Sequence, residues 1–93
     1  MSDLTNMINE ARIVWKEGDS AMALELLGNP ILNENEETNF LMGEIYYSRQ
    51  EWGAALNCFR RCLQISPGSG AAQTYVDLIL NILGFFHTDQ FNP

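Results

Sequence analysis

The residues whose types could do metal or redox chemistry are two cysteines and one histidine. Cys58 and Cys62 lie four positions apart, and His87, the only histidine, lies in the C-terminal stretch. Two thiols without a second pair of ligands make a weak zinc pattern, and a regular helix does not readily offer disulfide geometry at this spacing. We therefore interpret both cysteines as structural thiols of a reducing cytoplasm and predict no metal and no cofactor. Zinc or redox chemistry at these three residues is the alternative.

Other kinds of catalysis also lack their residue patterns in this chain. A single histidine and the absence of a serine-centred elbow leave a nucleophile without a base. The glycine-rich stretch at residues 67–70 lacks the lysine that follows in a phosphate-binding loop. Glu36 and Glu37 are explained by the favourable position of acids at a helix start. The sequence therefore predicts that the protein is not an enzyme.

Length and charge narrow the classes of partner. The chain has 93 residues, which suits one small domain, and a formal net charge of −7 from 12 acidic and 5 basic residues. An acidic balance disfavours nucleic acid and anionic membranes, both of which attract basic surfaces. It favours solubility and suits a basic partner, although a merely solvated acidic surface is the preferred interpretation.

No stretch has the pattern of a secretory signal or a membrane span. Residues 1–6 lack the positive charge and the apolar core of a signal. The most apolar stretch, from Tyr75 to Phe86, is about a dozen residues long and is interrupted by Asp77 and Asn81, whereas a spanning helix needs roughly 20. The sequence predicts a soluble, cytoplasmic protein.

The hydrophobic pattern predicts five helices and no strand. Apolar residues recur at helical spacing in each segment, and no stretch alternates as a strand does. Gly18 offers a left-handed stop after the first helix, and Asp19 or Ser20 can cap the second. Pro67 and Gly84 end the last two helices. The expected helices cover residues 4–16, 20–27, 35 to the turn at 49–51, 52–65 and 69–83.

One helix pair is used twice along the chain. When residues 4–28 are aligned with 36–66, Ala23 matches Ala55 at a distance of 32 residues, and Leu27 matches Phe59. The fifth helix then resembles the first helix of a third pair. This internal repetition is typical of arrays in which each helix pair covers its neighbour.

At this point residues 36–69 resemble a tetratricopeptide repeat, a helix-turn-helix unit of 34 residues. Met42 stands where that family usually has leucine, and Cys62 where it usually has alanine. The first copy is looser, because Ala11 replaces the glycine, and residues 81–93 resemble the ending of small stand-alone bacterial members of the family. The residues that carry the resemblance are Gly43, Tyr46, Ala55, Phe59 and Pro67.

The resemblance implies an all-α, right-handed array of antiparallel helix pairs, a tetratricopeptide-like solenoid. The chain would form a single domain, residues 1–93, with a degenerate repeat at 4–28 and a well-matched repeat at 36–69. A half-repeat at 69–84 would act as a capping helix, and residues 85–93 would form a tail. The family further implies a concave groove for peptides, without a cofactor and without catalysis.

In this family the first helix of each pair lines the groove. By register, the groove-facing residues here are Thr5, Ile8, Arg12, Trp15, Glu37, Phe40, Glu44 and Tyr47. Tyr46 and Met42 are expected on another face, toward the core. The alternative is that Trp15 and Phe40 simply pack against the fifth helix. A lysine- and arginine-rich clamp for a terminal carboxylate is not expected, because the matching positions hold only one basic residue, Arg12.

The fifth helix is apolar over more of its circumference than one neighbour covers. Either the tail packs back over it, which we prefer, or a second copy of the chain does, giving a weak homodimer instead of a monomer. The residues expected in this contact are Tyr75, Ile79, Ile82, Phe85, Phe86 and Phe91. Two functional hypotheses follow: an interaction module that binds a protein or peptide in the groove, and a structural protein that self-associates through the fifth helix and tail.

Overall fold

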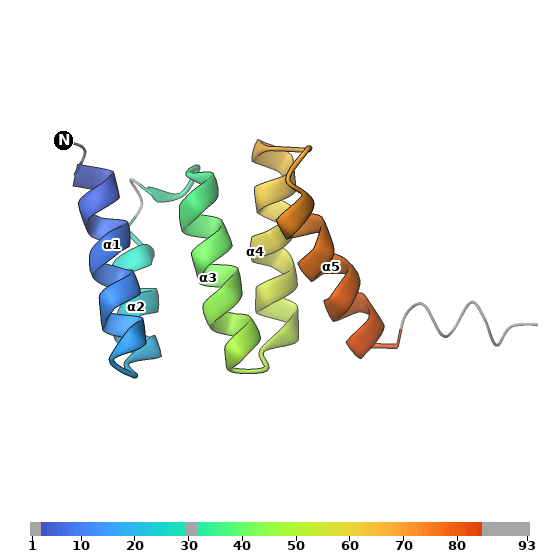
Figure 1. Ribbon diagram of the computed structural model, residues 1–93, viewed down its shortest axis with the longest axis horizontal. Helices are drawn as coiled ribbons and strands as arrows, with labels where there is room; N and C mark the ends of the chain where they lie inside the picture. The colour runs from blue at the N-terminus through green and yellow to red at the C-terminus, as the bar shows by residue number, and fades with distance from the viewer. Residues whose placement is uncertain (1–2, 30–31, 85–93) are drawn as a thin grey trace, which may run out of the picture.

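The computed structural model describes residues 3–29 and 32–84 (Figure 1). Over these residues the chain is all-α, without a strand, and forms a tetratricopeptide-like array, as predicted. The observed helices begin and end within about two residues of the expected positions, the uncertainty usual for helix ends. They are α1 (Asp3–Lys16), α2 (Ser20–Leu27), α3 (Glu36–Ser48), α4 (Trp52–Ile65) and α5 (Gly70–Ile82). Phe85, Phe86, His87 and Phe91 lie outside the described residues, so the predictions made for them stay predictions.

The helices follow one another along the array, and α3 lies at its centre (Figure 1). Helix α1 packs on α2, α3 on α4, and α4 on α5, while α3 also contacts both α1 and α2. Leu41 and Ile45 on one side of α3 belong to a core shared with α1 and α2. Phe40, Tyr46 and Tyr47 on another side pack against a second core, built from α4 and α5. Helix α3 therefore contributes side chains to both cores, and shared packing of this kind is how neighbouring repeats stabilise each other.

The second helix pair closes through a contact between a glycine and an aromatic ring. A Cβ atom placed on Gly43 would lie 2.7 Å from Cζ of Phe59, a ring that is completely buried. Only glycine permits this approach of α3 to α4. In the first pair, the equivalent positions hold Ala11 and Leu27, and both are buried.

The two helix-turn-helix connections have the same backbone geometry. Gly18 ends α1 in the left-handed region with φ of +98°, and Gln50 ends α3 there with φ of +61°. The N–H of Asp19 donates to the carbonyl of Val14, and the N–H of Glu51 donates to that of Tyr46. These bonds, which link residues five apart, define a Schellman motif after each first helix. Of the two cap candidates for α2, Asp19 is the one used, since its Oδ1 accepts from the N–H of Met22 at 3.0 Å.

None of the helices described has the length and apolarity to span a membrane.

Candidate functional site

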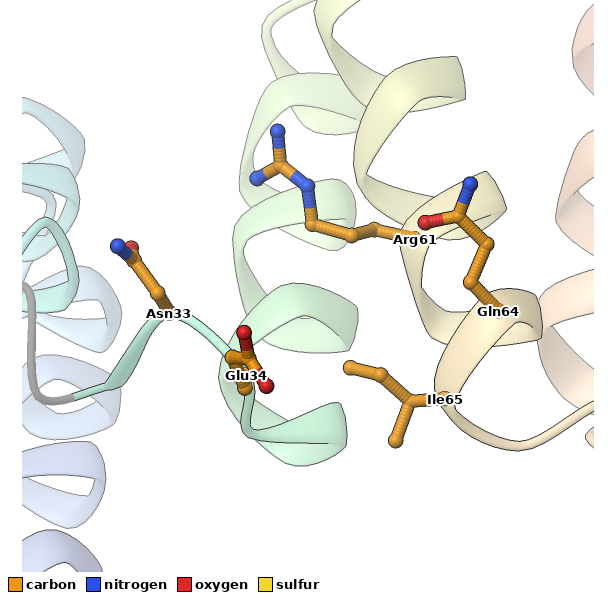
Figure 2. A pocket seen from close by; sticks show the side chains of 5 residues that line it. All are labelled: Asn33, Glu34, Arg61, Gln64 and Ile65. Carbon is orange, nitrogen blue, oxygen red and sulfur yellow. The ribbon is translucent and has the colours of Figure 1, made fainter.

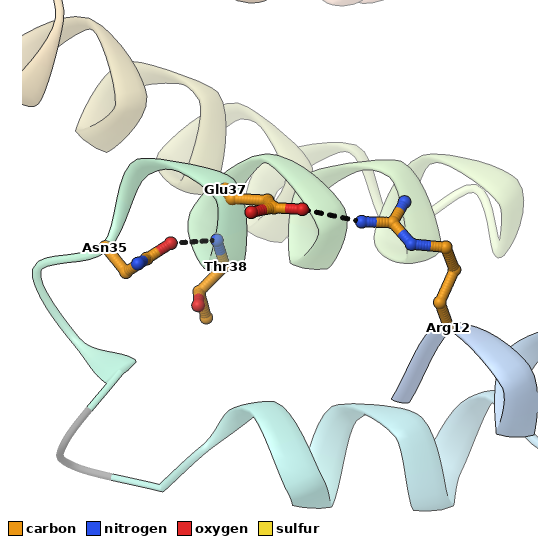
Figure 3. Close-up of polar contacts among 4 residues, drawn as sticks. All are labelled: Arg12, Asn35, Glu37 and Thr38. Carbon is orange, nitrogen blue, oxygen red and sulfur yellow. Dashed lines mark hydrogen bonds and ion pairs between the residues drawn. The ribbon is translucent and has the colours of Figure 1, made fainter. Parts of the chain in front are cut away.

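An ion pair joins the first helices of the two pairs. Nη2 of Arg12 in α1 donates to Oε2 of Glu37 in α3 at 3.0 Å (Figure 3). The two side chains are 38% and 61% exposed, and a pair this exposed contributes about 0–1 kcal/mol to stability. Its main effect is to hold one basic and one acidic side chain side by side across the α1–α3 boundary. Sequence register predicted both residues for the same surface.

The start of α3, which orients Glu37 and Phe40, is fixed by two asparagines. Oδ1 of Asn35 accepts from the N–H of Thr38 at 2.9 Å and caps the helix (Figure 3). The buried Nδ2 of Asn39 donates to the carbonyls of Asn33 at 3.0 Å and Asn35 at 2.9 Å. Arg61 of α4 donates to Oδ1 of Asn39 at 3.4 Å. Asn39 therefore ties the connection before α3 to both helices of the second pair.

Sequence reasoning missed Asn39 altogether. The signal available was a polar residue beside the apolar Phe40 and Leu41, one helical turn after the cap residue Asn35. A buried amide with all its partners is typical of such a position.

Aromatic rings from α3 and α5 form a continuous cluster. The ring of Tyr75 in α5 lies 5.7 Å from Phe40 and 5.1 Å from Tyr47, edge-to-face in both cases. It also stacks on the buried ring of Phe59 in α4, with centroids 4.3 Å apart and an interplanar angle of 3°. The edge-to-face and near-parallel arrangements are those that aromatic pairs prefer. Tyr75, which we expected in self-association or tail packing, thus lies beside the predicted groove residues. The alternative that Phe40 packs on the fifth helix agrees with its contact to Tyr75.

Glu44 is the half-buried carboxylate of this cluster. The hydroxyl of Tyr75 donates to its Oε2 at 3.5 Å, a long hydrogen bond. Burial raises the pKa of Glu44 above its usual value, against the opposing effects of the Arg12 guanidinium and the Tyr75 hydroxyl. Burial and the neighbouring Glu44 carboxylate likewise raise the pKa of Tyr75. Among the described residues Glu44 has no ion pair with nitrogen and oxygen within 4.0 Å.

We name the surface formed by these side chains the candidate face. They are partly exposed, come from three helices that are not consecutive in the sequence, and are linked by the contacts given above. The candidate face consists of Arg12, Glu37, Phe40, Glu44, Tyr47 and Tyr75. Trp15 is half-buried and packs against the first core, and Thr5 is exposed on α1.

Two of the predicted surface residues belong to the core, which corrects the sequence analysis. Ile8, expected in the groove, is 2% exposed and packs in the first core. Ile79, expected in self-association or tail packing, is 0% exposed and packs in the second core. Neither side chain can reach a partner, because the neighbouring helices already cover it. Ile82, by contrast, is 48% exposed.

Two surface hollows lie near α3. The smaller, of about 300 Å³, is lined by Glu36, Glu37, Phe40, Ser69 and Ala71, so it borders the candidate face between the N-terminal ends of α3 and α5. The larger, of about 470 Å³, is lined by Asn33, Glu34, Arg61, Gln64 and Ile65 (Figure 2). All of these larger-hollow side chains are exposed, and none belongs to the candidate face. With no buried anchor, the larger hollow is a poor binding site in spite of its size.

The two cysteines are free and buried in α4. The thiol of Cys62 donates to the carbonyl of Glu36 at 3.5 Å, and burial, with the charge of Glu36, raises the pKa of Cys62 to about 11. Burial also raises the pKa of Cys58. Thiols in such surroundings are protonated and unreactive at neutral pH. Within residues 3–29 and 32–84, no three histidine, cysteine or acidic side chains are grouped closely enough to hold a metal ion.

Comparison with known families assigns the central part of the chain. The family described as tetratricopeptide repeat matches residues 36–69, which run from the first residue of α3 to the cap of α5. No curated protein and no solved structure matched the chain. The match supports protein–protein interaction in general, and the family is typically non-enzymatic.

Proposed function

Because residues 36–69 are a tetratricopeptide repeat, we propose that the chain is an adaptor that binds a peptide or partner domain on the candidate face. The cytoplasm is the compartment in which we expect it to act. The observation that carries the proposal is the concentration of partly exposed aromatic and charged side chains on this face. Tyrosine and arginine are the residue types that anchor protein interfaces most often, because they combine large contact area with hydrogen bonding.

The arrangement of α3 supports this proposal. Leu41 and Ile45 are buried in the first core, and Phe40, Tyr46 and Tyr47 pack against the second. Phe40 and Tyr47 nevertheless stay partly exposed, beside Glu37 and Glu44 and flanked by Arg12 and Tyr75. Leaving aromatic rings half-solvated forgoes apolar burial that a bound peptide would supply.

The test compares affinity capture from a lysate of the source cell by three forms of the chain. Tyr47→Ala removes a ring of the candidate face, whereas Ile13→Ala removes an exposed apolar side chain of α1 outside it. We expect a partner that is retained by the wild type and by Ile13→Ala and is lost by Tyr47→Ala. Circular dichroism controls for folding, because Tyr47 also contacts Trp52. Equal capture by folded Tyr47→Ala and wild type would remove the candidate face as the binding site.

A second candidate function is self-association through α5. Leu78, Ile82 and Leu83 are 44%, 48% and 40% exposed, at the end of the array where a further helix pair would pack. Light scattering over a wide concentration range, on wild type and on Ile82→Asp, tests it. Self-association predicts a dimer that dissociates on dilution and is absent in Ile82→Asp. A monomer at every concentration would exclude this function.

A further inference from the structure

We propose that the partner is a basic peptide, and that one of its lysine or arginine side chains lies against Phe40, Tyr47 and Tyr75 with its cation on Glu44. This inference rests on the proposed function, because it names the chemistry of the partner for the same candidate face. It is carried by the charges of the face, by the half-burial of Glu44 and by the aromatic side chains around it.

The charges on the candidate face do not balance. It carries one basic side chain, Arg12, and two acidic ones, Glu37 and Glu44. The guanidinium of Arg12 is bonded to Glu37 at 3.0 Å. Glu44 is left with the hydroxyl of Tyr75, at 3.5 Å. A surplus negative charge therefore remains in the middle of the face, and a cation from a partner would neutralise it.

The environment of Glu44 makes this charge costly in the free protein. Its carboxylate is half-buried beside a tyrosine ring, and burial raises its pKa in spite of the nearby Arg12. Partly desolvated carboxylates without a strong partner are typical of functional sites. A bound ammonium or guanidinium group would supply the charge-assisted hydrogen bond that the free chain does not provide.

The aromatic rings of the candidate face also suit a lysine or arginine side chain. The ring of Tyr75 lies 5.7 Å from that of Phe40 and 5.1 Å from that of Tyr47, and all three rings are partly exposed. The methylene groups of lysine or arginine pack well on aromatic rings, and their cations are attracted to ring faces. The net charge of −7 attracts a basic peptide over a longer range.

Two other kinds of peptide fit less well. An acidic peptide would bring a carboxylate against Glu44 and would be repelled by the remaining negative charge of the chain. A purely apolar peptide would bury Glu44 further without giving it a partner, which opposes binding.

The experiment is a selection of random peptides on three forms of the whole chain: wild type, Glu44→Gln and Glu25→Gln. Glu25 is exposed on α2, which contributes nothing to the candidate face, so Glu25→Gln is a matched control for the loss of one charge. We expect peptides selected on wild type and on Glu25→Gln to share a lysine or arginine at one fixed position. Peptides selected on Glu44→Gln should lack it.

A double-substitution cycle then tests the contact directly. One selected peptide is synthesised with its basic residue and again with norleucine, which has an uncharged side chain of similar length. Norleucine should weaken binding to wild type and to Glu25→Gln about tenfold, and should have little effect on Glu44→Gln.

Each outcome bears on one of the two proposals. Peptides that share no basic position, or an equal effect of norleucine on all three forms, would overturn the basic-peptide inference. The proposed function would survive that result if Tyr47→Ala still abolished their binding. Failure to select any peptide above background would overturn the basic-peptide inference, whereas the proposed function, which also allows a partner domain, is decided by the capture experiment with Tyr47→Ala.

Discussion

The two helix pairs of this chain fill the same frame with different side chains. At equivalent positions 32 residues apart, the first pair has Ala11 against Leu27 and the second has Gly43 against Phe59. All four residues are buried. Compared with the second pair, the first pair has the larger residue, alanine, on its first helix and the smaller one, leucine, on its second. The second pair has the smaller residue, glycine, on its first helix and the larger one, phenylalanine, on its second. The space between the two helices is therefore filled in both pairs, although the residues that fill it differ.

The pairs differ more in their polar contacts. The second pair begins with the cap residue Asn35 and contains the buried Asn39. The residue of the first pair that is equivalent to Asn39 is Met7, which packs on the first core. Helix α2 has 8 residues and α4 has 14. The second pair, which alone matches the family, is therefore held by both apolar packing and a buried hydrogen-bond network. Among the described residues of the first pair, no buried side-chain amide corresponds to Asn39.

The strongest test of this comparison exchanges the residues of the close contact. Gly43→Ala places a methyl group 2.7–2.9 Å from three ring atoms of Phe59. We expect the free energy of unfolding to fall by about 3 kcal/mol, because a buried ring has little room to move. Gly43→Ala with Phe59→Leu recreates the combination of the first pair. The double variant should lose clearly less than the sum of the two single variants, as measured by urea denaturation.

The control for this exchange is Gly53→Ala in α4. Nothing lies within 4 Å of a Cβ atom at Gly53, so alanine should stabilise the helix by about 0.5–1 kcal/mol through its higher helix propensity. Additive effects of Gly43→Ala and Phe59→Leu would show that the two pairs are not related by exchange of volume.

The second test removes the hydrogen bonds of Asn39, whose equivalent in the first pair is Met7. Asn39→Ala takes away two donated hydrogen bonds and one accepted from Arg61. We expect a loss of about 1–2 kcal/mol, since the carbonyls of Asn33 and Asn35 lose their amide donor. Thermal unfolding followed by circular dichroism measures it, with the exposed Asn57→Ala in α4 as control. Equal stability of the two variants would mean that the network contributes nothing.

The third test concerns the turn that joins the two helices of each pair. Gln50 has φ of +61°, in the region where the first pair has Gly18. A side chain in this conformation is strained, and part of that strain is offset by the smaller entropy that glutamine loses on folding. Gln50→Gly should therefore raise the free energy of unfolding by about 0.5–1 kcal/mol, and Gly18→Gln should lower it by a similar amount. Changes of the same sign in both variants would contradict the equivalence of the two turns.

Sequence patterns determined more of the fold than of the candidate face. Gly18, Pro67 and the apolar spacing located the helices, because these signals act within a few residues. Ile8 and Phe40 occupy equivalent positions, yet Ile8 is buried and Phe40 stays half-exposed. The burial of Ile8 could therefore not be predicted from register. Register assigns a side chain to a face of its helix, whereas burial depends on how closely the next helix approaches. The packing of Tyr75 on Phe40 and Tyr47 depends on the same long-range geometry.

The smallest expected effect concerns a position at which the two pairs carry opposite charges, Arg12 in the first and Glu44 in the second. Because burial raises the pKa of Glu44 in the folded chain, the native state binds this proton more tightly than the unfolded state does. The ionised carboxylate therefore destabilises the protein at neutral pH, and this penalty disappears as the pH falls through the raised pKa. Glu44→Gln should raise the melting temperature at pH 7 and should have less effect as the pH approaches 4.

The charged and titratable groups that face Glu44 decide whether this interpretation is right. They are Arg12 from α1 and Tyr75 from α5, and both oppose the rise in its pKa. Arg12→Gln should therefore enlarge the stabilisation gained from Glu44→Gln, because it removes the positive charge that lowers the pKa of Glu44. Glu25→Gln serves as the control for loss of one acidic group from the surface of α2. If the melting temperatures of Glu44→Gln and wild type differ by the same amount at every pH, the ionised carboxylate is not the cause. The candidate face would then lack the costly negative charge for which we propose a basic partner.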